Sequence, residues 1–140
     1  MIEAKSLGLE EARKIIDAML EYSTVTKQGP PMSHAVVDSA GVLVAFVRMD
    51  GAPVMTRRMA ENKAYTAVIW QRDTRAIDKR LKQDNMNIIY FGEPDRQAAV
   101  PGGIPIKTSD GSIIGAVGSS GRSPDEDEEA ALAGIRAFKE

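Results

Sequence analysis

The chain contains the stretches His34-Ala35-Val36-Val37-Asp38 and Val42-Leu43-Val44-Ala45-Phe46-Val47-Arg48, joined by the link Ser39-Ala40-Gly41. Both stretches are rich in β-branched and aromatic residues, which favour strands, and the glycine in the link allows a tight turn. This is the strongest hairpin signal in the chain, and the rest of the fold can be placed around it.

A second hairpin is predicted where Ile104-Pro105-Ile106-Lys107 and Ser112-Ile113-Ile114-Gly115-Ala116-Val117-Gly118 flank a turn that contains Asp110-Gly111. Asp-Gly is a favoured turn dipeptide between two strands. Proline has no backbone N–H to donate to a neighbouring strand. Pro105 therefore predicts that the first strand of this hairpin lies at a sheet edge or at a bulge.

Helices are predicted before, between and after the two hairpins. Apolar residues recur at helical spacing from Leu9 to Leu20, with Gly8 as the N-cap, and again from Met55 to about Arg72. A shorter helix runs to about Gln83 with Thr74 as its N-cap, and the capping box Ser123-Pro124-Asp125-Glu126 begins the last helix. The stretch 84–103 is rich in Asn, Gly and Pro and reads as a loop. The order predicts one α+β domain over residues 1–140, built around an antiparallel sheet.

Composition limits the chemistry of this domain. The 140 residues include no cysteine and one histidine, His34, and carry a net charge of -2. Thiolate nucleophiles and cysteine-bound metals are therefore excluded within the chain. The slightly acidic balance gives no electrostatic reason to bind nucleic acid or an anionic membrane. No apolar run approaches the roughly 18 residues that cross a membrane, and we expect a cytoplasmic protein.

Three polar residues near the first hairpin are candidate site residues. His34 is the only near-neutral acid–base group in the chain and a possible haem ligand, although a partly exposed histidine at a strand edge, without function, is the simpler interpretation. Arg48 and Asp50 flank a sharp turn at Gly51, where they either meet an anionic ligand or pair with each other.

Lys63 and Tyr65 lie on the helix predicted from Met55. Lys63 is a candidate catalytic group, or it points inward to a carboxylate in a paired environment. A surface hydrogen bond is the simpler role for Tyr65. Gly102 and Gly103 lie in the unusual stretch Val100-Pro101-Gly102-Gly103-Ile104-Pro105, where glycines allow a flat ligand or a carboxylate to approach the backbone.

The first turn of the last helix is acidic. Asp125 and Glu128 are three residues apart, so both lie on one helical face and form a candidate site for a hard cation or surface iron. Acidic residues in a first helical turn are also favoured by the helix dipole, which explains them without a metal.

Several of these segments together resemble one family. The segments are Ala35-Val36-Val37-Asp38, Gly41-Val42-Leu43-Val44-Ala45-Phe46, Arg48-Met49-Asp50-Gly51-Ala52, Asn62-Lys63-Ala64-Tyr65-Thr66-Ala67, Pro101-Gly102-Gly103-Ile104-Pro105-Ile106, Asp110-Gly111 and Ile114-Gly115-Ala116-Val117-Gly118-Ser119-Ser120-Gly121. In this order they resemble the GlcG/HbpS-like family, which includes extracellular haem-sensing proteins and the C-terminal domain of PduO-type corrinoid adenosyltransferases. The resemblance covers nearly the whole chain from Leu9 onward.

The resemblance implies a profilin-like, three-layer α/β/α fold with a five-stranded antiparallel sheet, and assembly into homo-oligomers. It also implies binding of haem or a related tetrapyrrole, sometimes with haem degradation or iron handling. The leading hypothesis is therefore a haem-binding protein. Its haem propionates would meet Arg48, Lys63 or backbone amides of Gly102 and Gly103, and its iron would be held by His34, Tyr65 or an oxygen ligand.

Two alternatives stay open at this point. One is a small lyase or isomerase in which Arg48 or the glycine-loop amides hold a carboxylate or keto-acid substrate while Asp50, Lys63 or His34 moves a proton. Arg48 and Asp50 of one subunit would form that pocket with Lys63, Tyr65 and the Gly102–Gly103 loop, and a subunit interface could complete it. The other alternative is an oligomeric accessory protein that binds no ligand.

Overall fold

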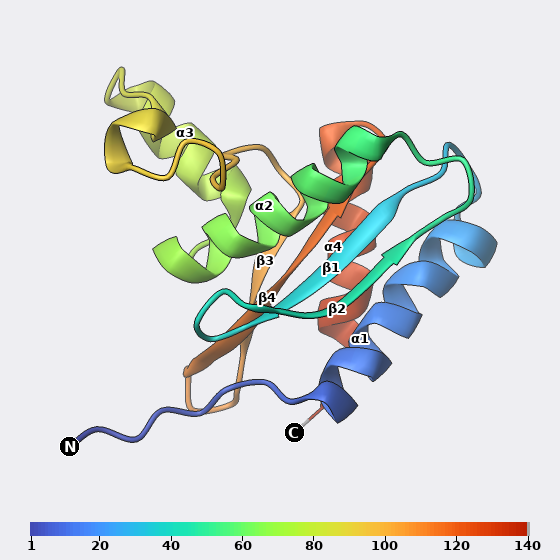
Figure 1. The fold of residues 1–140 in the computed structure, drawn as a ribbon, viewed down its shortest axis with the longest axis horizontal. Helices are drawn as coiled ribbons and strands as arrows, with labels where there is room; N and C mark the ends of the chain where they lie inside the picture. The colour runs from blue at the N-terminus through green and yellow to red at the C-terminus, as the bar shows by residue number, and fades with distance from the viewer. Residues whose placement is uncertain (140) are drawn as a thin grey trace.

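The computed structural model describes residues 1–139 as an antiparallel sheet with helices on both faces (Figure 1). The prediction of one α+β domain is confirmed, with only Glu140 outside the described residues. In chain order the elements are α1 (Leu9–Glu21), a π-helical turn (Tyr22–Thr26), β1 (Ser33–Asp38), β2 (Leu43–Arg48), α2 (Val54–Trp70), α3 (Thr74–Gln83), a 3-10 turn (Ile88–Phe91), β3 (Gly103–Lys107), β4 (Ile113–Ser120) and α4 (Pro124–Ala137).

The sheet joins the two predicted hairpins through their inner strands. The strand order is β2-β1-β4-β3, and all three pairings are antiparallel. Pro105 lies in β3, an edge strand, as its missing N–H predicted. Within residues 1–139 the sheet has four strands, so the expected fifth strand is wrong. The long stretch 84–102 adds no strand because its backbone turns repeatedly, with positive φ at Asn85, Gly92 and Glu93.

The helices form two layers on opposite faces of this sheet. In Figure 1, α2 crosses one face, while α1 and α4 lie side by side on the other. The α1/α4 layer buries the larger apolar cluster, which includes Ile15, Met19 and Val117. A smaller cluster under α2 includes Val37, Ala64 and Val68. The three-layer α/β/α arrangement is therefore present, and the profilin-like designation stays a prediction.

Glycines bring the backbone of α2 close to the sheet. Gly103 of β3 and Gly118 of β4 are cross-strand partners directly beneath this helix. A Cβ atom on Gly103 would lie 2.3 Å from the Lys63 carbonyl oxygen, and one on Gly118 would lie 2.1 Å from the Ala60 carbonyl oxygen. Because real Cβ atoms do not approach that closely, these positions exclude every side chain. Small residues on the helix, such as Ala60 and Ala64, complete the close contact.

Two of the three predicted helix N-caps are confirmed. Gly8 is the N-cap of α1, and the Ser123 hydroxyl caps α4 by accepting from the Glu126 N–H. The prediction for α3 is wrong, because Asp73 is its N-cap and Thr74 is its first helical residue. The Thr74 hydroxyl instead accepts the Gly103 N–H at 2.9 Å, which ties α3 to the start of β3. Among the described helices, none is both long and apolar enough to cross a membrane.

Candidate functional site

His34 is a fully buried residue of β1, so the expected partial exposure is wrong. Both of its ring nitrogens are hydrogen-bonded. Its Nε2 lies 2.9 Å from the Ser23 hydroxyl, and its Nδ1 lies 2.8 Å from the Ser119 hydroxyl. The Ser23 hydroxyl also contacts the carbonyl oxygens of Met19 and Leu20, each at 3.1 Å, where it must be the donor. Ser23 therefore accepts from Nε2–H, and Ser119 donates to Nδ1, which fixes one neutral tautomer.

The surroundings of His34 oppose its protonation. Burial lowers the pKa of His34 to about 4, and the nearby positive charge of Arg122 acts in the same direction. The Arg122 guanidinium donates to carbonyl oxygens of Ser23, Lys27 and Pro30, so it also holds the π-helical turn. His34 belongs to the core in this arrangement, and its nitrogens are used within the fold.

Lys63 points inward from α2, which is the inward-facing alternative predicted for it. Its Nζ lies 2.9 Å from Asp127 Oδ2 and donates to the Ser119 carbonyl oxygen at 2.9 Å. Both side chains are almost fully buried, at 2% and 5% exposure. Burial raises the pKa of Asp127, and the pairing with Lys63 opposes that rise. The second carboxylate oxygen of Asp127 accepts from the backbone N–H of Arg122. The Lys63–Asp127 ion pair itself links α2 to α4.

The glycine pair lies beneath this lysine. A Cβ atom on Gly102 would lie 2.8 Å from the Ser119 carbonyl oxygen and 3.0 Å from Lys63 Nζ, and its φ is +128°. Gly102 and Gly103 are buried. Their shared role is close packing, and the space above their backbone is taken by Lys63 and Thr74.

Tyr65 contacts the loop that follows the 3-10 turn. Its hydroxyl donates to Glu93, with both carboxylate oxygens within 2.8 Å, and the Arg96 guanidinium lies 3.7 Å from the ring centre. Burial and the bond to Glu93 raise the pKa of Tyr65. This residue fastens the loop onto α2.

Arg48 and Asp50 are exposed at the end of β2. Arg48 Nη1 donates to the Ala52 carbonyl oxygen at 2.9 Å, which stabilises the turn. The ion pair weighed as an alternative is not formed, because no contact between Arg48 and Asp50 occurs among the described ion pairs of residues 1–139.

Asp125 and Glu128 share one partner, Arg75 of α3. Arg75 Nε lies 3.0 Å from Glu128 Oε2, and its Nη2 contacts Asp125. In the part of the chain that the structure describes, no three His, Cys, Asp or Glu residues gather as metal ligands do. The pair joins α3 to α4, and its predicted cation stays untested.

The residues predicted from sequence therefore do not share one pocket. His34, Lys63 and Gly102 meet around Ser119 inside the core. Tyr65 binds the loop after the 3-10 turn. Arg48 pairs with Ser33 next to His34, but its side chain is exposed and donates to the Ala52 carbonyl oxygen.

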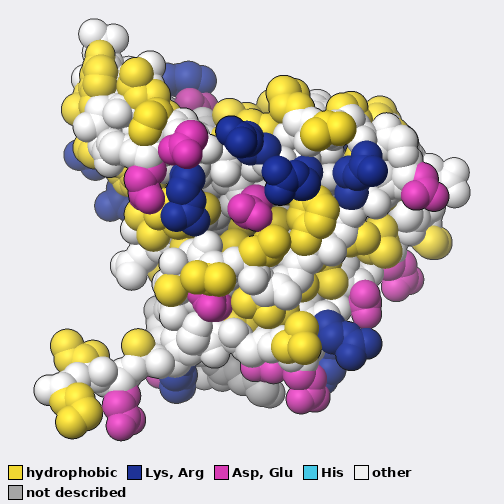
Figure 2. All heavy atoms as spheres, in the orientation of Figure 1, with side chains coloured by type: hydrophobic (Ala, Val, Ile, Leu, Met, Phe, Trp, Pro, Cys, Tyr) yellow, Lys and Arg dark blue, Asp and Glu magenta, His cyan; other side chains and the backbone are white. Residues whose placement is uncertain are grey.

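An apolar depression lies elsewhere, between α2, α3 and the loop that follows α3. It consists of two adjoining hollows of about 390 and 440 Å³, and Leu81 and Met86 line both. We call it the Met86 trough. Its other apolar lining residues are Met59, Trp70, Ile88, Phe91, Ala98, Ala99 and Val100. Hydrophobic side chains gather over this part of the molecule in Figure 2, at the upper left. Volumes of about 300–1,000 Å³ are usual for small-ligand sites.

The wall of the trough is held in place by specific contacts. Trp70 packs edge-on against Phe91 at 4.9 Å, and its Nε1 donates to Gln97 Oε1 at 2.7 Å. Gln97 in turn donates to the Gly92 carbonyl oxygen. Met86 and Phe91 nevertheless remain 41% and 48% exposed, which leaves apolar surface open to a ligand.

The sequence contained one sign of this trough. Ile88-Ile89-Tyr90-Phe91 is an apolar run inside a stretch otherwise marked as a loop by Asn, Gly and Pro. An apolar run in a loop lacks a sheet or helix partner, so its exposure indicates a contact surface. The Asn, Gly and Pro residues around this run predict a loop for the whole stretch, so its composition alone does not single the run out.

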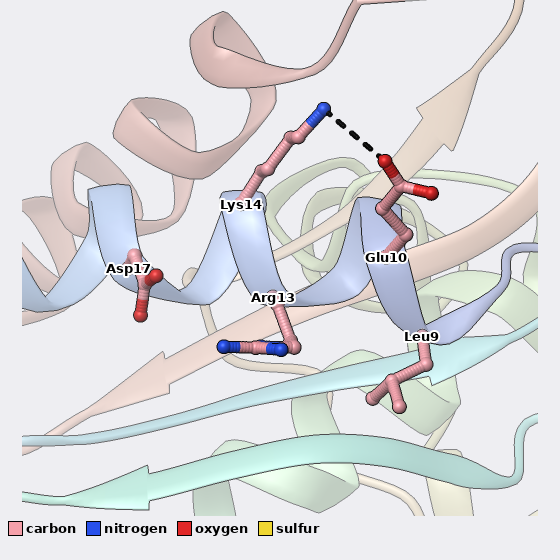
Figure 3. Close-up of a pocket in the computed structure, with 5 residues that line it drawn as sticks. All are labelled: Leu9, Glu10, Arg13, Lys14 and Asp17. Carbon is pink, nitrogen blue, oxygen red and sulfur yellow. Dashed lines mark ion pairs between the residues drawn. The ribbon is translucent and has the colours of Figure 1, made fainter.

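A further hollow of about 520 Å³ runs along α1, lined by Leu9, Glu10, Arg13, Lys14 and Asp17. Figure 3 shows Leu9 and Arg13 on the side of α1 opposite Lys14, which reaches Glu10 in an ion pair of 3.8 Å. All of its lining residues come from one helix. Because no second element supplies converging polar groups, we do not place a small ligand there.

The fold is a small α/β/α domain with an exposed apolar depression beside α2 and α3. The model of the family described as "Haem degrading protein HbpS-like" matches residues 7–136. This chain belongs to the HbpS-like family.

Individual relatives agree with this assignment. Protein GlcG of Escherichia coli K12 is 33% identical over 114 residues, which cover 81% of each chain. A crystal structure of a double mutant of Streptomyces reticuli HbpS is 33% identical, covers 100% of this chain and 92% of its own, and superposes with a TM-score of 0.85. The structure of a PduOC complex with haem has the same fold, with a TM-score of 0.82, 24% identity and 96% of each chain covered.

The buried environment of His34 predicts a pH dependence of stability. The folded pKa of about 4 lies below the ordinary value of 6.5, so the unfolded chain binds the proton first as pH falls. Stability is therefore complete above pH 6.5 and falls toward pH 4, by about 3 kcal/mol in all. The chain has one histidine, so every histidine ring signal in an NMR pH titration belongs to His34. A midpoint near 4 is expected, and a midpoint near 6.5 would contradict the buried, neutral ring.

The Lys63–Asp127 ion pair predicts an asymmetric response to mutation. Lys63→Met leaves a buried carboxylate without its cation, and we expect a loss of about 3–5 kcal/mol in the free energy of unfolding by denaturant titration. Adding Asp127→Asn removes the unpaired charge and should restore part of that loss. Lys14→Met is the control, because its ion pair with Glu10 is exposed and worth less than about 1 kcal/mol. A double variant less stable than Lys63→Met would rule out this account.

Proposed function

We propose that this protein binds haem, or a closely related planar tetrapyrrole, in the Met86 trough. Membership of the HbpS-like family supports this ligand class, and the 33% identical HbpS chain strengthens it. The observation that carries the site is an exposed apolar depression with a thioether at its centre, where both hollows are lined by Met86.

The trough fits the chemistry of a porphyrin. A porphyrin ring is flat and apolar, and Leu81, Phe91 and Val100 offer apolar surface from three segments of the chain. Methionine sulfur is a known protein ligand of haem iron. Met86 is the residue of the trough that we assign to hold the iron, with Met59 as the second thioether that lines it. A bound haem would supply redox and small-molecule-binding chemistry.

Cations lie at the margin of the trough for the haem propionates. Arg72 and Arg80 line one hollow, and Lys82 lines the other. Arg80 already pairs with Asp84 at 2.8 Å, and Lys82 pairs with Asp78 at 2.9 Å. The described ion pairs of residues 1–139 do not include Arg72. Its guanidinium is therefore the cation that we assign to a propionate.

This site differs from the one expected from sequence. His34 and Lys63 use their polar atoms inside the fold, and Tyr65 donates to Glu93. Rearranging them to reach a ligand would break buried hydrogen bonds, each of which is costly to leave unmade. The lyase or isomerase alternative meets the same obstacle within one subunit, because Arg48 and Asp50 are exposed while His34 and Lys63 are buried and use their polar atoms inside the fold.

Assembly and activity extend the proposal. We infer a homo-oligomer, supported by the exposed apolar residues Leu9, Val42 and Leu43, which lie around α1 and the free edge of β2. An unpaired strand edge beside apolar surface favours association. Haem degradation, iron handling and a cytoplasmic location remain predictions, as does the alternative of an accessory protein without a ligand.

Haemin titration followed by absorption spectroscopy tests the ligand and the site together. The wild-type chain should show a shifted Soret band that saturates at a fixed stoichiometry per subunit. Met86→Leu keeps the side-chain volume but removes the sulfur, so the Soret position should change and the affinity should fall about tenfold.

Met55→Leu is the matched control, because Met55 is 69% exposed at the start of α2 and does not line the trough. It should bind haemin as the wild type does. The haem proposal fails if wild-type binding does not saturate. The assignment of Met86 fails if its variant and the Met55 variant behave alike.

A further inference from the structure

A small polar hollow adjoins α2 and is separate from the Met86 trough. Its volume is about 150 Å³, and its lining residues are Arg57, Arg58, Glu61, Asn62, Asp95 and Arg96. We call it the arginine hollow. Lys and Arg side chains gather over α2 on the face shown in Figure 2. Three guanidinium groups at one depression are a concentration of donors that match the two oxygens of a carboxylate.

Two of these arginines have no carboxylate partner among the residues that the structure describes. Arg57 and Glu61 are four residues apart on α2, a spacing that commonly forms an ion pair. Nevertheless, neither Arg57 nor Arg58 occurs in any ion pair found within residues 1–139. Their charges are therefore available to a ligand at the hollow.

The third arginine is held in position. The Arg96 guanidinium stacks on the Tyr65 ring at 3.7 Å, and its Nη1 lies 3.6 Å from Glu93. The loop that carries Arg96 is tied to α2 by the Asn62 amide, which donates to the Asp95 carbonyl oxygen at 3.1 Å. Because these contacts already order the loop, a ligand bound here loses less free energy to ordering it.

The charge of the hollow selects the kind of anion. It is lined by three arginines and two carboxylates, Glu61 and Asp95, and Arg96 also pairs with Glu93. Because the positive charge is largely balanced, a singly charged carboxylate meets less repulsion from these carboxylates than a phosphate dianion does. We propose that the arginine hollow binds the carboxylate group of an organic acid, held by Arg57, Arg58 and Arg96.

The carboxylate has two possible sources, and the proposal requires neither in particular. Arg58 is next to Met59, and Arg96 is next to Gln97, and both of these neighbours line the Met86 trough. A propionate of haem bound in the trough is therefore one source. A free small organic acid is the other, and it does not depend on haem binding.

The test uses the propionate ion as a singly charged probe at low ionic strength. Its binding to the full chain is followed by the NMR signals of the arginine Nε–H groups. We expect saturable shifts in the millimolar range at Arg57, Arg58 and Arg96, and an affinity at least about tenfold weaker in the double variant Arg57→Gln/Arg58→Gln.

The matched control is Arg13→Gln/Arg136→Gln, which removes the same charge from exposed residues on α1 and α4. It should bind propionate as the wild type does. Phosphate at equal ionic strength should bind more weakly than propionate. Tighter phosphate binding, or equal loss of propionate binding in both double variants, would overturn the proposal.

Haemin distinguishes the two sources. If haemin displaces propionate and binds more weakly to Arg57→Gln/Arg58→Gln, the carboxylate is a haem propionate. If propionate still binds when haemin is bound, or if haemin does not bind at all, the hollow takes a free acid. The haem proposal is then judged by its own titration. If propionate does not bind and haemin affinity is unchanged in the double variant, the arginine hollow is not a carboxylate site.

Discussion

The close contact between α2 and the sheet is the constraint on which the rest of the structure depends. Gly103 and Gly118 have no side chains to hold α2 away from the sheet. The carbonyl oxygens of Lys63 and Ala60 therefore pack directly against the backbone of these glycines. The Lys63 side chain passes inward from this helix to Asp127 of α4. The Lys63–Asp127 ion pair therefore joins the helices on the two faces of the sheet, since it begins on α2 and ends on α4.

That constraint explains why the polar residues most conspicuous in the sequence are structural. Lys63 and His34 meet the same residue, Ser119, through its carbonyl oxygen and its hydroxyl. The other ring nitrogen of His34 bonds to Ser23 in the π-helical turn that follows α1. Buried polar groups of this kind must all be satisfied, and they are. A ligand that used them would have to replace several buried hydrogen bonds, so exposed apolar surface is the better place for one.

The sequence predicted the hairpins, the helix order and the edge position of Pro105, because these depend on local periodicity and on the missing proline N–H. It also allowed for an inward-facing Lys63 with a carboxylate partner, but Asp127 lies 64 residues away, and no local pattern identifies it. The glycine pair at Gly102 and Gly103 was noticed for its composition and assigned to a ligand. In the fold the close neighbour is the helix α2 itself, a long-range contact that spacing along the chain does not reveal. Met86 was passed over because it lies in a stretch without periodicity.

We expect a tetrapyrrole to occupy the Met86 trough and to leave the hydrogen bonds around His34 intact. Methyl NMR of protein labelled at its seven methionines, with haemin added, measures both. The Met86 signal, identified from its loss in Met86→Leu, should shift strongly on binding, together with Met59. The signals of Met19 and Met32, which are fully buried in the core, should stay in place, as should those of the His34 ring. Haemin binding that moves the His34 ring and leaves Met86 unchanged would contradict the account.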